Sequence, residues 1–229
     1  MSDSIFIISY YKSRNKQNLY NLLKQLKIFK SKIAVIINDD KTNQLKFEEA
    51  NNVYTLLRKN VGMNIGAWNE GYRYFNDYEN YFFFQDECFV KKNTFFEQYL
   101  HLLSKKDLGL IGETVNTKWS KSWDEMQLSP MNYKILINEE EMLRVNFYKK
   151  QIKKWGIELG YSPIHLRSLS MAIKSVNLKK INGFNIGFNK EECIASEIAI
   201  SKKIMNLDLK IAQSNKEHFY YIGHKEWHN

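Results

Sequence analysis

Three consecutive polar residues follow the most apolar run of the sequence, and their side chains are suited to binding a metal or a polar ligand. Residues 81–84 read Tyr-Phe-Phe-Phe, which is typical of a central strand buried on both faces. Gln85, Asp86 and Glu87 come directly after this run. In open α/β sheets, ligands bind at the carboxyl ends of the strands, and carboxylate oxygens are good ligands for hard divalent cations. Acidic residues after a strand are also common in solvated loops, so the preceding segment matters.

That preceding segment contains glycines at two informative positions. Gly62 and Gly66 lie just before a helix predicted over residues 67–75, whose aromatic residues are spaced for one buried face. They suit a loop that needs positive φ or a close backbone approach at a helix N-terminus. Such a turn is common on its own. The order of loop, helix, buried strand and acidic cluster within residues 57–87 favours a ligand site.

Strand and helix patterns also alternate in the rest of the chain. Strands are predicted over residues 5–10, 33–37 and 53–57, with a leucine-rich helix between the first two. Two β-α-β units so early in the chain indicate a parallel, Rossmann-like sheet. Later predictions are a helix over 93–103, a strand over 108–111, a helix opened by Asn138, a strand over 166–173, a helix over 175–181, a helix over 190–205 and a strand near 209–211.

The composition predicts a globular chain. The sequence has 229 residues, of which 44% are hydrophobic and 14% aromatic, and this length fits one domain with a substantial core. No apolar run approaches the roughly 20 residues of a membrane span, and the N-terminal residues lack the pattern of a signal peptide. Cys88 and Cys193 do not indicate a disulfide framework, so a cytoplasmic location is expected.

The formal net charge of +9 is compatible with an anionic partner. A nucleotide diphosphate, an anionic membrane face and a nucleic acid all fit this charge, as do solvated faces rich in lysine. No basic and aromatic module typical of nucleic-acid binding is recognisable, so nucleic acid is not an expected partner. Peripheral association with the inner face of a membrane and the oligomeric state stay open.

The glycine-containing segment resembles a block of one enzyme family. Its pattern is Asn60-x-Gly62-x-Asn64-x-Gly66-Ala67-x-Asn69-x-Gly71. It is similar to the "N-x-G…G-A-x-N-x-G" block of GT-A glycosyltransferases, in the large inverting family that includes many bacterial polysaccharide enzymes. There the block precedes a helix and then a hydrophobic strand that ends in an Asp-x-Asp-type motif, and Gln85-Asp86-Glu87 occupies that place here. A looser likeness to the acceptor-side block lies at Gly183-Phe184-Asn185.

The resemblance implies a nucleotide-sugar-dependent glycosyltransferase with a GT-A fold. This fold is a single Rossmann-like α/β domain over residues 1–229, with a mixed, mostly parallel central sheet flanked by helices. The nucleotide-binding half would span about residues 1–112 and the acceptor-side half about 113–229. The implied reaction moves a sugar from a nucleotide-diphosphate sugar to a hydroxyl of a glycan, lipid-linked or protein acceptor, with a metal and with inversion.

The same resemblance implies which residues bind the donor. The loop after the first strand and the acid after the second would hold the base and ribose, because a carboxylate can accept hydrogen bonds from ribose hydroxyls or a base N–H. Without the resemblance, residues 38–41 would be interpreted as a turn. The implied donor-binding residues are Ser9, Tyr10, Tyr11, Asp39, Asp40, Arg58, Asn60, Gly62, Asn64 and Gln85.

A divalent cation, Mn²⁺ or Mg²⁺, is the cofactor that the resemblance implies. Asp86 and Glu87 would hold it together with His224, since several GT-A enzymes supply a late histidine to the metal. Both ions accept carboxylate oxygens, and Mn²⁺ readily adds an imidazole. Zinc is not expected, because no Cys/His pair has the required spacing.

Inverting transfer needs a base that takes the proton from the acceptor hydroxyl. The family places this acid at the start of a helix after the acceptor-side block. Counting forward from residues 183–185 points to Glu191 or Glu192, and counting back from the strand near 209 points to Glu197. At 100° per residue, Glu197 lies on the same side as the isoleucines of the predicted helix, whereas Glu192 points away. Glu197 is therefore preferred, Glu192 is the second candidate, and a buried acid paired with a lysine is the structural alternative.

Two other functions share this architecture. A sugar-phosphate nucleotidyltransferase normally has a glycine-rich loop with Arg or Lys after the first strand, but residues 10–14 read Tyr-Tyr-Lys-Ser-Arg. A non-catalytic domain that binds glycans or nucleotide sugars would not hydrolyse the donor. Trp119 and Trp123, in the irregular segment 113–131, would stack on sugar rings if exposed and would form a satellite core if buried.

Overall fold

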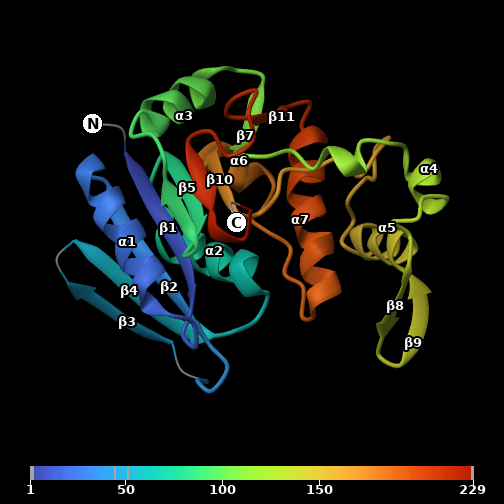
Figure 1. Cartoon of the computed structure of the whole chain (residues 1–229), viewed down its shortest axis with the longest axis horizontal. Coiled ribbons are helices and arrows are strands. Elements are labelled where there is room, and N and C mark those ends of the chain that lie inside the picture. Colours follow the sequence, from blue (N-terminus) through green and yellow to red (C-terminus); the bar gives the residue numbers. More distant parts are fainter. Residues whose placement is uncertain (1–2, 44, 51, 228–229) are drawn as a thin grey trace.

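An eight-stranded sheet forms the centre of the computed structural model, which describes residues 3–43, 45–50 and 52–227 (Figure 1). The strands lie in the order β11, β7, β10, β5, β1, β2, β4, β3, and β3 and β10 are antiparallel to their neighbours. This is the mixed, mostly parallel sheet that was expected. The strand bounds are β1 (Ser4–Tyr11), β2 (Lys32–Asp39), β3 (Lys46–Ala50), β4 (Val53–Lys59), β5 (Asn80–Gln85), β7 (Leu108–Gly112), β10 (Ser170–Lys174) and β11 (Lys210–Gln213).

Strand β5 is buried on both faces because its side chains alternate between two cores. Tyr81 and Phe83 belong to one hydrophobic cluster, and Phe82 and Phe84 belong to the other. This alternation explains why four consecutive apolar residues occur there. Trp68 adds a hydrogen bond from its indole N–H to the carbonyl oxygen of Phe84 over 3.0 Å.

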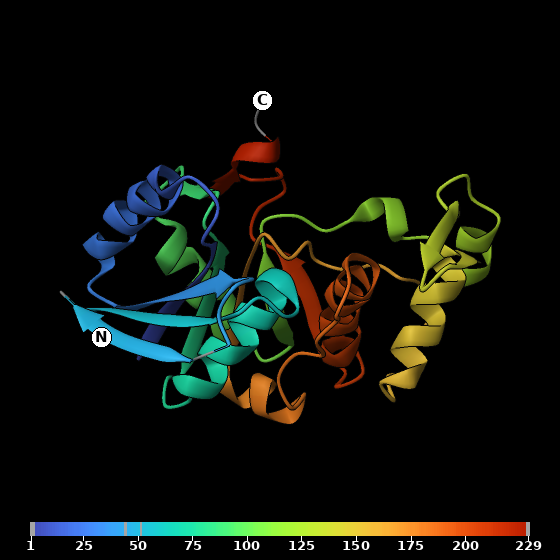
Figure 2. The ribbon, with the colours of Figure 1, turned by 90° about the horizontal axis from the view of Figure 1, so that it is seen from below.

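Helices cover both faces of the sheet (Figure 2). Leucines of α1 (Lys16–Leu26) and aromatic residues of α3 (Phe95–Ser104) pack into one cluster. Apolar residues of α2 (Met63–Tyr74), α6 (Ser175–Lys180) and α7 (Lys190–Met205) pack into the other. Among the described residues, none of the helices combines the length and apolar character needed to cross a bilayer.

A third hydrophobic cluster lies at one end of the molecule, beyond α7 (Figure 1). It includes Trp119 and Trp123, which are both buried, so these rings are core residues and not exposed platforms for sugars. Residues of α7 complete this cluster from the side of the sheet. The elements here are η2 (Thr117–Trp119), α4 (Trp123–Gln127), the hairpin of β8 (Lys134–Ile137) and β9 (Glu140–Leu143), and α5 (Arg144–Lys154).

The C-terminal segment returns to the centre of the molecule. Strand β12 (Ile222–His224) pairs with β6 (Cys88–Val90), which follows β5 directly, and this pairing places His224 opposite Cys88. Two short 3-10 helices remain: η1 (Lys27–Phe29) follows α1, and η3 (Lys225–Trp227) follows β12. The last described residues therefore lie near the end of the central strand.

Three predicted boundaries were wrong. The helix expected over residues 67–75 begins at Met63, directly after the positive φ of Gly62, so Gly66 lies inside the helix and not before it. The helix expected from Asn138 begins at Arg144, because Asn138 and Glu139 have φ values of 49° and 70° and form the turn of a hairpin. The strand expected over 166–173 begins at Ser170, since the residues before it form a loop with a single bridge at Leu166. The edge strand β3 was not predicted; all of its residues are exposed, so it has no buried pattern.

Both expected glycine properties occur where α2 begins, since Gly62 is the N-cap of this helix and Gly66 lies in its first turn. Gly62 has a φ of 78°, and a Cβ atom at Gly66 would lie 1.9 Å from the carbonyl oxygen of Val61. A side chain at position 66 would therefore have to displace the backbone of Val61, and backbone atoms cannot move aside as easily as the end of a flexible side chain.

We expect Gly66→Ala to lower the free energy of unfolding by about 3 kcal/mol or more, because this overpacking involves backbone atoms. Denaturant titration would measure the loss. Gly156→Ala is the control: Gly156 has open space around it, so only its positive φ of 71° opposes a side chain, at a cost of about 1 kcal/mol. Equal losses in both variants would contradict the close approach at Gly66.

Candidate active site

A cleft of about 640 Å³ opens where the carboxyl ends of the parallel strands meet. Strand β10 runs in the opposite direction, so the loop before its first residue reaches the same edge, and the N-terminal half of α7 forms the far wall. The cleft thus forms at the edge of the sheet where ligands bind in open α/β folds. Its lining residues are Ser9, Tyr10, Tyr11, Arg14, Asn38, Asn60, Met63, Asn64, Gln85, Asp86, Ser168, Leu169, Lys190, Cys193, Ile194, Glu197 and Glu226.

Most of the predicted donor-binding residues line this cleft, where Asn60 comes from the loop before α2 and Asn64 from the first turn of α2. Ser9 donates a hydrogen bond to the carbonyl oxygen of Phe84 over 3.3 Å. The hydroxyl of Tyr10 is bonded to the carbonyl oxygen of Arg14 over 2.8 Å. The first bond joins β1 to β5, and the second holds the loop that follows β1.

Asp39 is the last residue of β2 and Asp40 follows it, but neither is among the lining residues. Lys12 donates to Oδ2 of Asp39 over 2.6 Å, and this bond lowers the pKa of Asp39. Asp40 accepts hydrogen bonds from the hydroxyl of Tyr11 and, over 3.0 Å, from the side chain of Asn60, and the bond from Tyr11 is the main cause of its lowered pKa. Both carboxylates are ionised at neutral pH. Asp40 holds two residues that line the cleft, whereas Lys12, the partner of Asp39, does not line it.

One of these two acids is predicted to contact the base or ribose. Its alanine variant should weaken nucleotide binding by about fivefold to tenfold, the loss of roughly one charge-assisted hydrogen bond. The response of binding to Mn²⁺ should stay unchanged, because neither acid belongs to the predicted metal site. Calorimetry with UDP and GDP on Asp39→Ala and Asp40→Ala would measure this. Equal affinities in wild type and both variants would show that residues 38–41 form a turn with no part in nucleotide binding.

Arg58 was predicted to bind the donor, and the structure places it behind the cleft wall. It is buried and donates to Oδ1 of Asn38 over 2.6 Å and to the carbonyl oxygen of Val61 over 2.9 Å. Burial lowers the pKa of its guanidinium group. Arg58 therefore supports the turn that leads into α2, and its direct contacts are with protein groups. Gly62, also predicted to bind the donor, is the N-cap of α2 and affects the site through its backbone conformation.

Asp86 is the acid that the buried strand delivers into the cleft. It is 2% exposed, and its Oδ2 atom has no hydrogen-bond partner among the residues that the structure describes. Its Oδ1 atom lies 3.7 Å from a guanidinium nitrogen of Arg14. Burial raises the pKa of Asp86 to about 6, while Arg14 opposes and Glu87 adds to this rise. A buried carboxylate oxygen without a partner is costly, so its presence in a cleft fits a ligand that completes it.

Glu87 and His224, the other predicted metal ligands, have different partners. Glu87 forms an ion pair with Arg14. The Nε2 atom of His224 lies 3.2 Å from Oε1 of Gln85, and its Nδ1 atom accepts the N–H of Glu226 over 3.3 Å. Within the described residues, no group of three or more His, Cys, Asp or Glu side chains is arranged to hold a metal ion. Asp86 is the predicted ligand whose free oxygen fits a cation.

The structure distinguishes the three glutamates of α7. Glu197 lines the cleft with its side chain 20% exposed, and accepts the hydroxyl of Ser168 over 2.7 Å. Burial would raise the pKa of Glu197, but its neighbours His165 and Ser168 lower it, so Glu197 is a carboxylate at neutral pH. Glu192 accepts the N–H of Phe188 over 2.8 Å, and Glu191 accepts the hydroxyl of Tyr148 over 2.6 Å. Those two stabilise the structure around the start of α7.

Several residues of the site were not predicted. Arg14 and Lys190 bring positive charge to the cleft, and Ser168 joins its two sides by accepting, at its carbonyl oxygen, bonds from Asn64 and Gln85 over 2.6 and 2.8 Å. The sequence around Ser168 has no motif; only the antiparallel direction of β10 brings it here.

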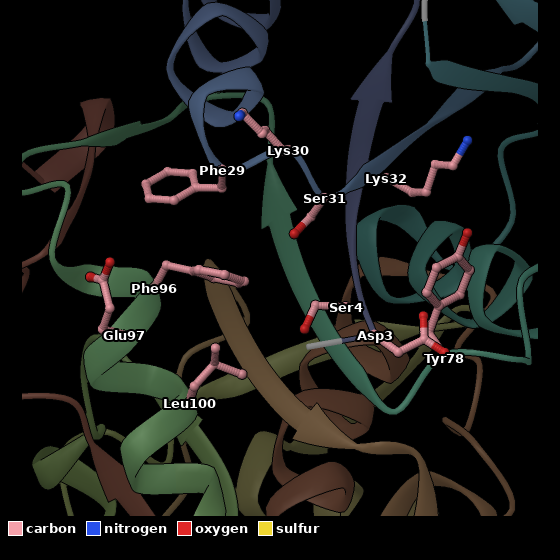
Figure 3. Close-up of a pocket in the computed structure, with 10 residues that line it drawn as sticks. All are labelled: Asp3, Ser4, Phe29, Lys30, Ser31, Lys32, Tyr78, Phe96, Glu97 and Leu100. Carbon is pink, nitrogen blue, oxygen red and sulfur yellow. The ribbon is translucent and has the colours of Figure 1, made fainter. Parts of the chain in front are cut away.

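A second hollow, of about 360 Å³, lies at the opposite edge of the sheet (Figure 3). Ser4 and Lys32 begin β1 and β2 there, and Phe29, Phe96 and Leu100 supply apolar walls. None of the predicted site residues lines it. The amino ends of parallel strands are not where such folds bind their ligands, so we assign it no role.

Comparison with known proteins supports the fold. No family model and no curated protein matches the sequence. The structure is similar to the mannosyltransferase PcManGT from Pyrobaculum calidifontis, solved with GDP-Man and Mn²⁺, with 10% identity and a TM-score of 0.53. That match covers 98% of this chain and 59% of that chain. At this identity the likeness shows the fold alone, and the chain therefore has the expected GT-A fold.

Two weaker likenesses have TM-scores of 0.47 and decide nothing further. One is the catalytic domain of Drosophila β1,4-galactosyltransferase 7 in complex with xylobiose, with 11% identity, covering 100% of this chain and 72% of that one. The other is a structure named as a glucose-1-phosphate thymidylyltransferase from Bacillus anthracis, with 10% identity, covering 100% of this chain and 91% of that one.

Proposed function

We propose that this chain is a glycosyltransferase that moves a sugar from a nucleotide-diphosphate sugar to a hydroxyl of a glycan, lipid-linked or protein acceptor, with inversion. One observation carries the proposal: an unpartnered buried carboxylate oxygen of Asp86 and the ionised carboxylate of Glu197 line the same cleft. The first suits a cation that accompanies a diphosphate, and the second suits proton removal from an acceptor.

The donor would lie along the carboxyl ends of β1, β2 and β5. Tyr11 offers an aromatic ring and Asn60 an amide group for the nucleoside. Arg14 and Lys190 are the basic side chains among the lining residues that can face a diphosphate. Asp86 would hold Mn²⁺ or Mg²⁺, and the bound cation would neutralise charge on the diphosphate leaving group.

Glu197 would act on the acceptor. As the acceptor oxygen bonds to the anomeric carbon, its O–H bond breaks and the proton passes to the carboxylate of Glu197. The bond from the anomeric carbon to the diphosphate oxygen breaks at the same time, and its electron pair leaves with the nucleoside diphosphate. Ser168 holds Glu197 through a 2.7 Å hydrogen bond, so the base needs little reorientation.

A panel of nucleotide sugars tests the proposal. We expect a UDP- or GDP-sugar to raise the melting temperature, more so with Mn²⁺, and we expect slow release of the nucleoside diphosphate, with water as acceptor. UDP and GDP without a sugar are the binding controls. Stabilisation without any release of nucleoside diphosphate would indicate a non-catalytic binding domain, and no response to any nucleotide would refute the proposed donor site.

A further inference from the structure

A buried histidine lies behind Glu197, in a loop that the sequence did not single out. His165 is 2% exposed, and its Nε2 atom lies 3.2 Å from Oε1 of Glu197. Ser168 donates to the other carboxylate oxygen, Oε2. Glu197 therefore has one oxygen held by a hydroxyl and the other facing an imidazole.

The surroundings of His165 fix its tautomer. Its Nδ1 atom lies 2.7 Å from the carbonyl oxygen of Pro163, which can only accept, so Nδ1 carries a hydrogen. In the neutral ring Nε2 then has a lone pair, and the side-chain nitrogen of Asn116 can donate to it from 3.3 Å. Arg167 lies 3.4 Å from the amide oxygen of Asn116 and orients that amide.

The Nε2 atom thus faces two groups with opposite requirements. Asn116 is satisfied when Nε2 has a lone pair, whereas Oε1 of Glu197 is satisfied when a hydrogen lies between it and Nε2. When the ring is neutral, the pair of imidazole and carboxylate lacks that hydrogen and gains a strong bond when one proton arrives. The cationic groups nearby are Arg167, which reaches His165 through Asn116, and Lys202, which is bonded to the carbonyl oxygen of Ser162.

We propose that His165 is a positioning residue that completes the base, and that it receives the proton which Glu197 removes from the acceptor. This inference rests on the proposed glycosyl transfer. The acceptor proton moves to Oε1 of Glu197 and then to Nε2 of His165, which leaves a carboxylate and an imidazolium in contact. The new charge pair is enclosed by hydrogen bonds from Ser168 to Glu197 and from Nδ1 to Pro163.

Two substitutions separate proton uptake from simple positioning. His165→Gln can still place an N–H donor near Oε1 but has no basic nitrogen, whereas His165→Asn can keep only the bond to Pro163. We expect both to lower kcat for hydrolysis of the nucleotide sugar that wild type turns over, by about tenfold to a hundredfold, less than loss of the base itself. Donor affinity should stay within about twofold.

His101→Gln is the matched control, because His101 is exposed on α3, away from the cleft. The pH profile adds a readout that folding alone would not change: the rise of kcat with pH should differ in shape between wild type and His165→Gln. A Gln variant with wild-type kcat and pH profile would overturn proton uptake by His165.

A resting-state measurement keeps this inference separate from the proposed function. Nitrogen-15 NMR of histidine-labelled chain at pH 8, with the signal assigned by its loss in His165→Gln, should show His165 with hydrogen on Nδ1 only. A ring protonated on Nε2 at that pH would overturn the inference, whether or not the chain is active. Absence of turnover in wild type would instead refute the proposed function.

Discussion

Asp86→Asn should abolish the metal-dependent part of nucleotide binding while the chain stays folded. The Oδ2 atom of Asp86 is buried, lacks a partner and belongs to a residue that lines the cleft. An amide supplies neither the negative charge nor the second carboxylate oxygen that a hard cation prefers. We expect Mn²⁺ to strengthen UDP or GDP binding to wild type by about tenfold or more, equivalent to at least about 1.4 kcal/mol, and to have no effect on the variant.

The same substitution should change how stability depends on pH. Because burial raises the pKa of Asp86 from 3.8 to about 6, the folded chain binds a proton more tightly there than the unfolded chain does. The contribution of Asp86 to stability is therefore present at acid pH and is lost as pH rises towards and through 6. Between pH 5 and pH 7, wild type should lose about 1 kcal/mol relative to Asp86→Asn.

Asp124→Asn is the control for both measurements, because Asp124 is exposed and lies far from the cleft, with a 3.5 Å contact to Lys149. Calorimetry and denaturant titration at two pH values would suffice. Nucleotide binding that responds neither to Mn²⁺ nor to the substitution would show that the metal site is wrongly placed. A parallel pH response in wild type and Asp86→Asn would show that Asp86 is not buried as an ionisable group.

The central part of the site could be predicted because its signals are local. Burial on both faces requires four consecutive apolar residues in β5, and that strand must end at the ligand-binding edge of the sheet. The start of α2 needs glycines because Gly62 has positive φ and a Cβ atom at Gly66 would meet the backbone of Val61. Each of these constraints restricts which residue types can occupy the positions. The sequence therefore predicted the strand, the glycine-containing turn and the position of Asp86 at the end of the strand.

The remaining part of the site depends on contacts between distant segments. Ser168 and His165 meet Glu197 only because β10 runs antiparallel beside β5, and strand direction leaves no pattern in the loop that precedes the strand. Arg14 is one of many basic residues in the sequence, and its position beside Asp86 depends on how the loop after β1 folds back. The hairpin at Asn138 was missed because the three glutamates that follow it are also typical of the first turn of a helix.

Glu197→Gln should separate catalysis from binding. Glutamine keeps the shape of the side chain and can still accept the hydrogen bond from Ser168, but it cannot take a proton from the acceptor. Donor affinity should stay within about twofold, or roughly 0.4 kcal/mol, because the base acts on the acceptor. Turnover should fall by about two to four orders of magnitude, the usual contribution of general-base catalysis.

Glu192→Gln is the matched control on the same helix. Its carboxylate accepts the backbone N–H of Phe188, just before α7, and lies in the first turn of that helix. Glutamine can still accept this bond but removes the negative charge that favours a helix N-terminus, so the melting temperature should fall slightly and activity only as the folded fraction falls. Melting temperature, donor affinity and hydrolysis rate measured on both variants distinguish the two roles. Turnover lost in Glu192→Gln but retained in Glu197→Gln would reverse the assignment. If both variants kept normal turnover, Glu191 would be tested next, although its bond to the hydroxyl of Tyr148 directs it towards the third hydrophobic cluster.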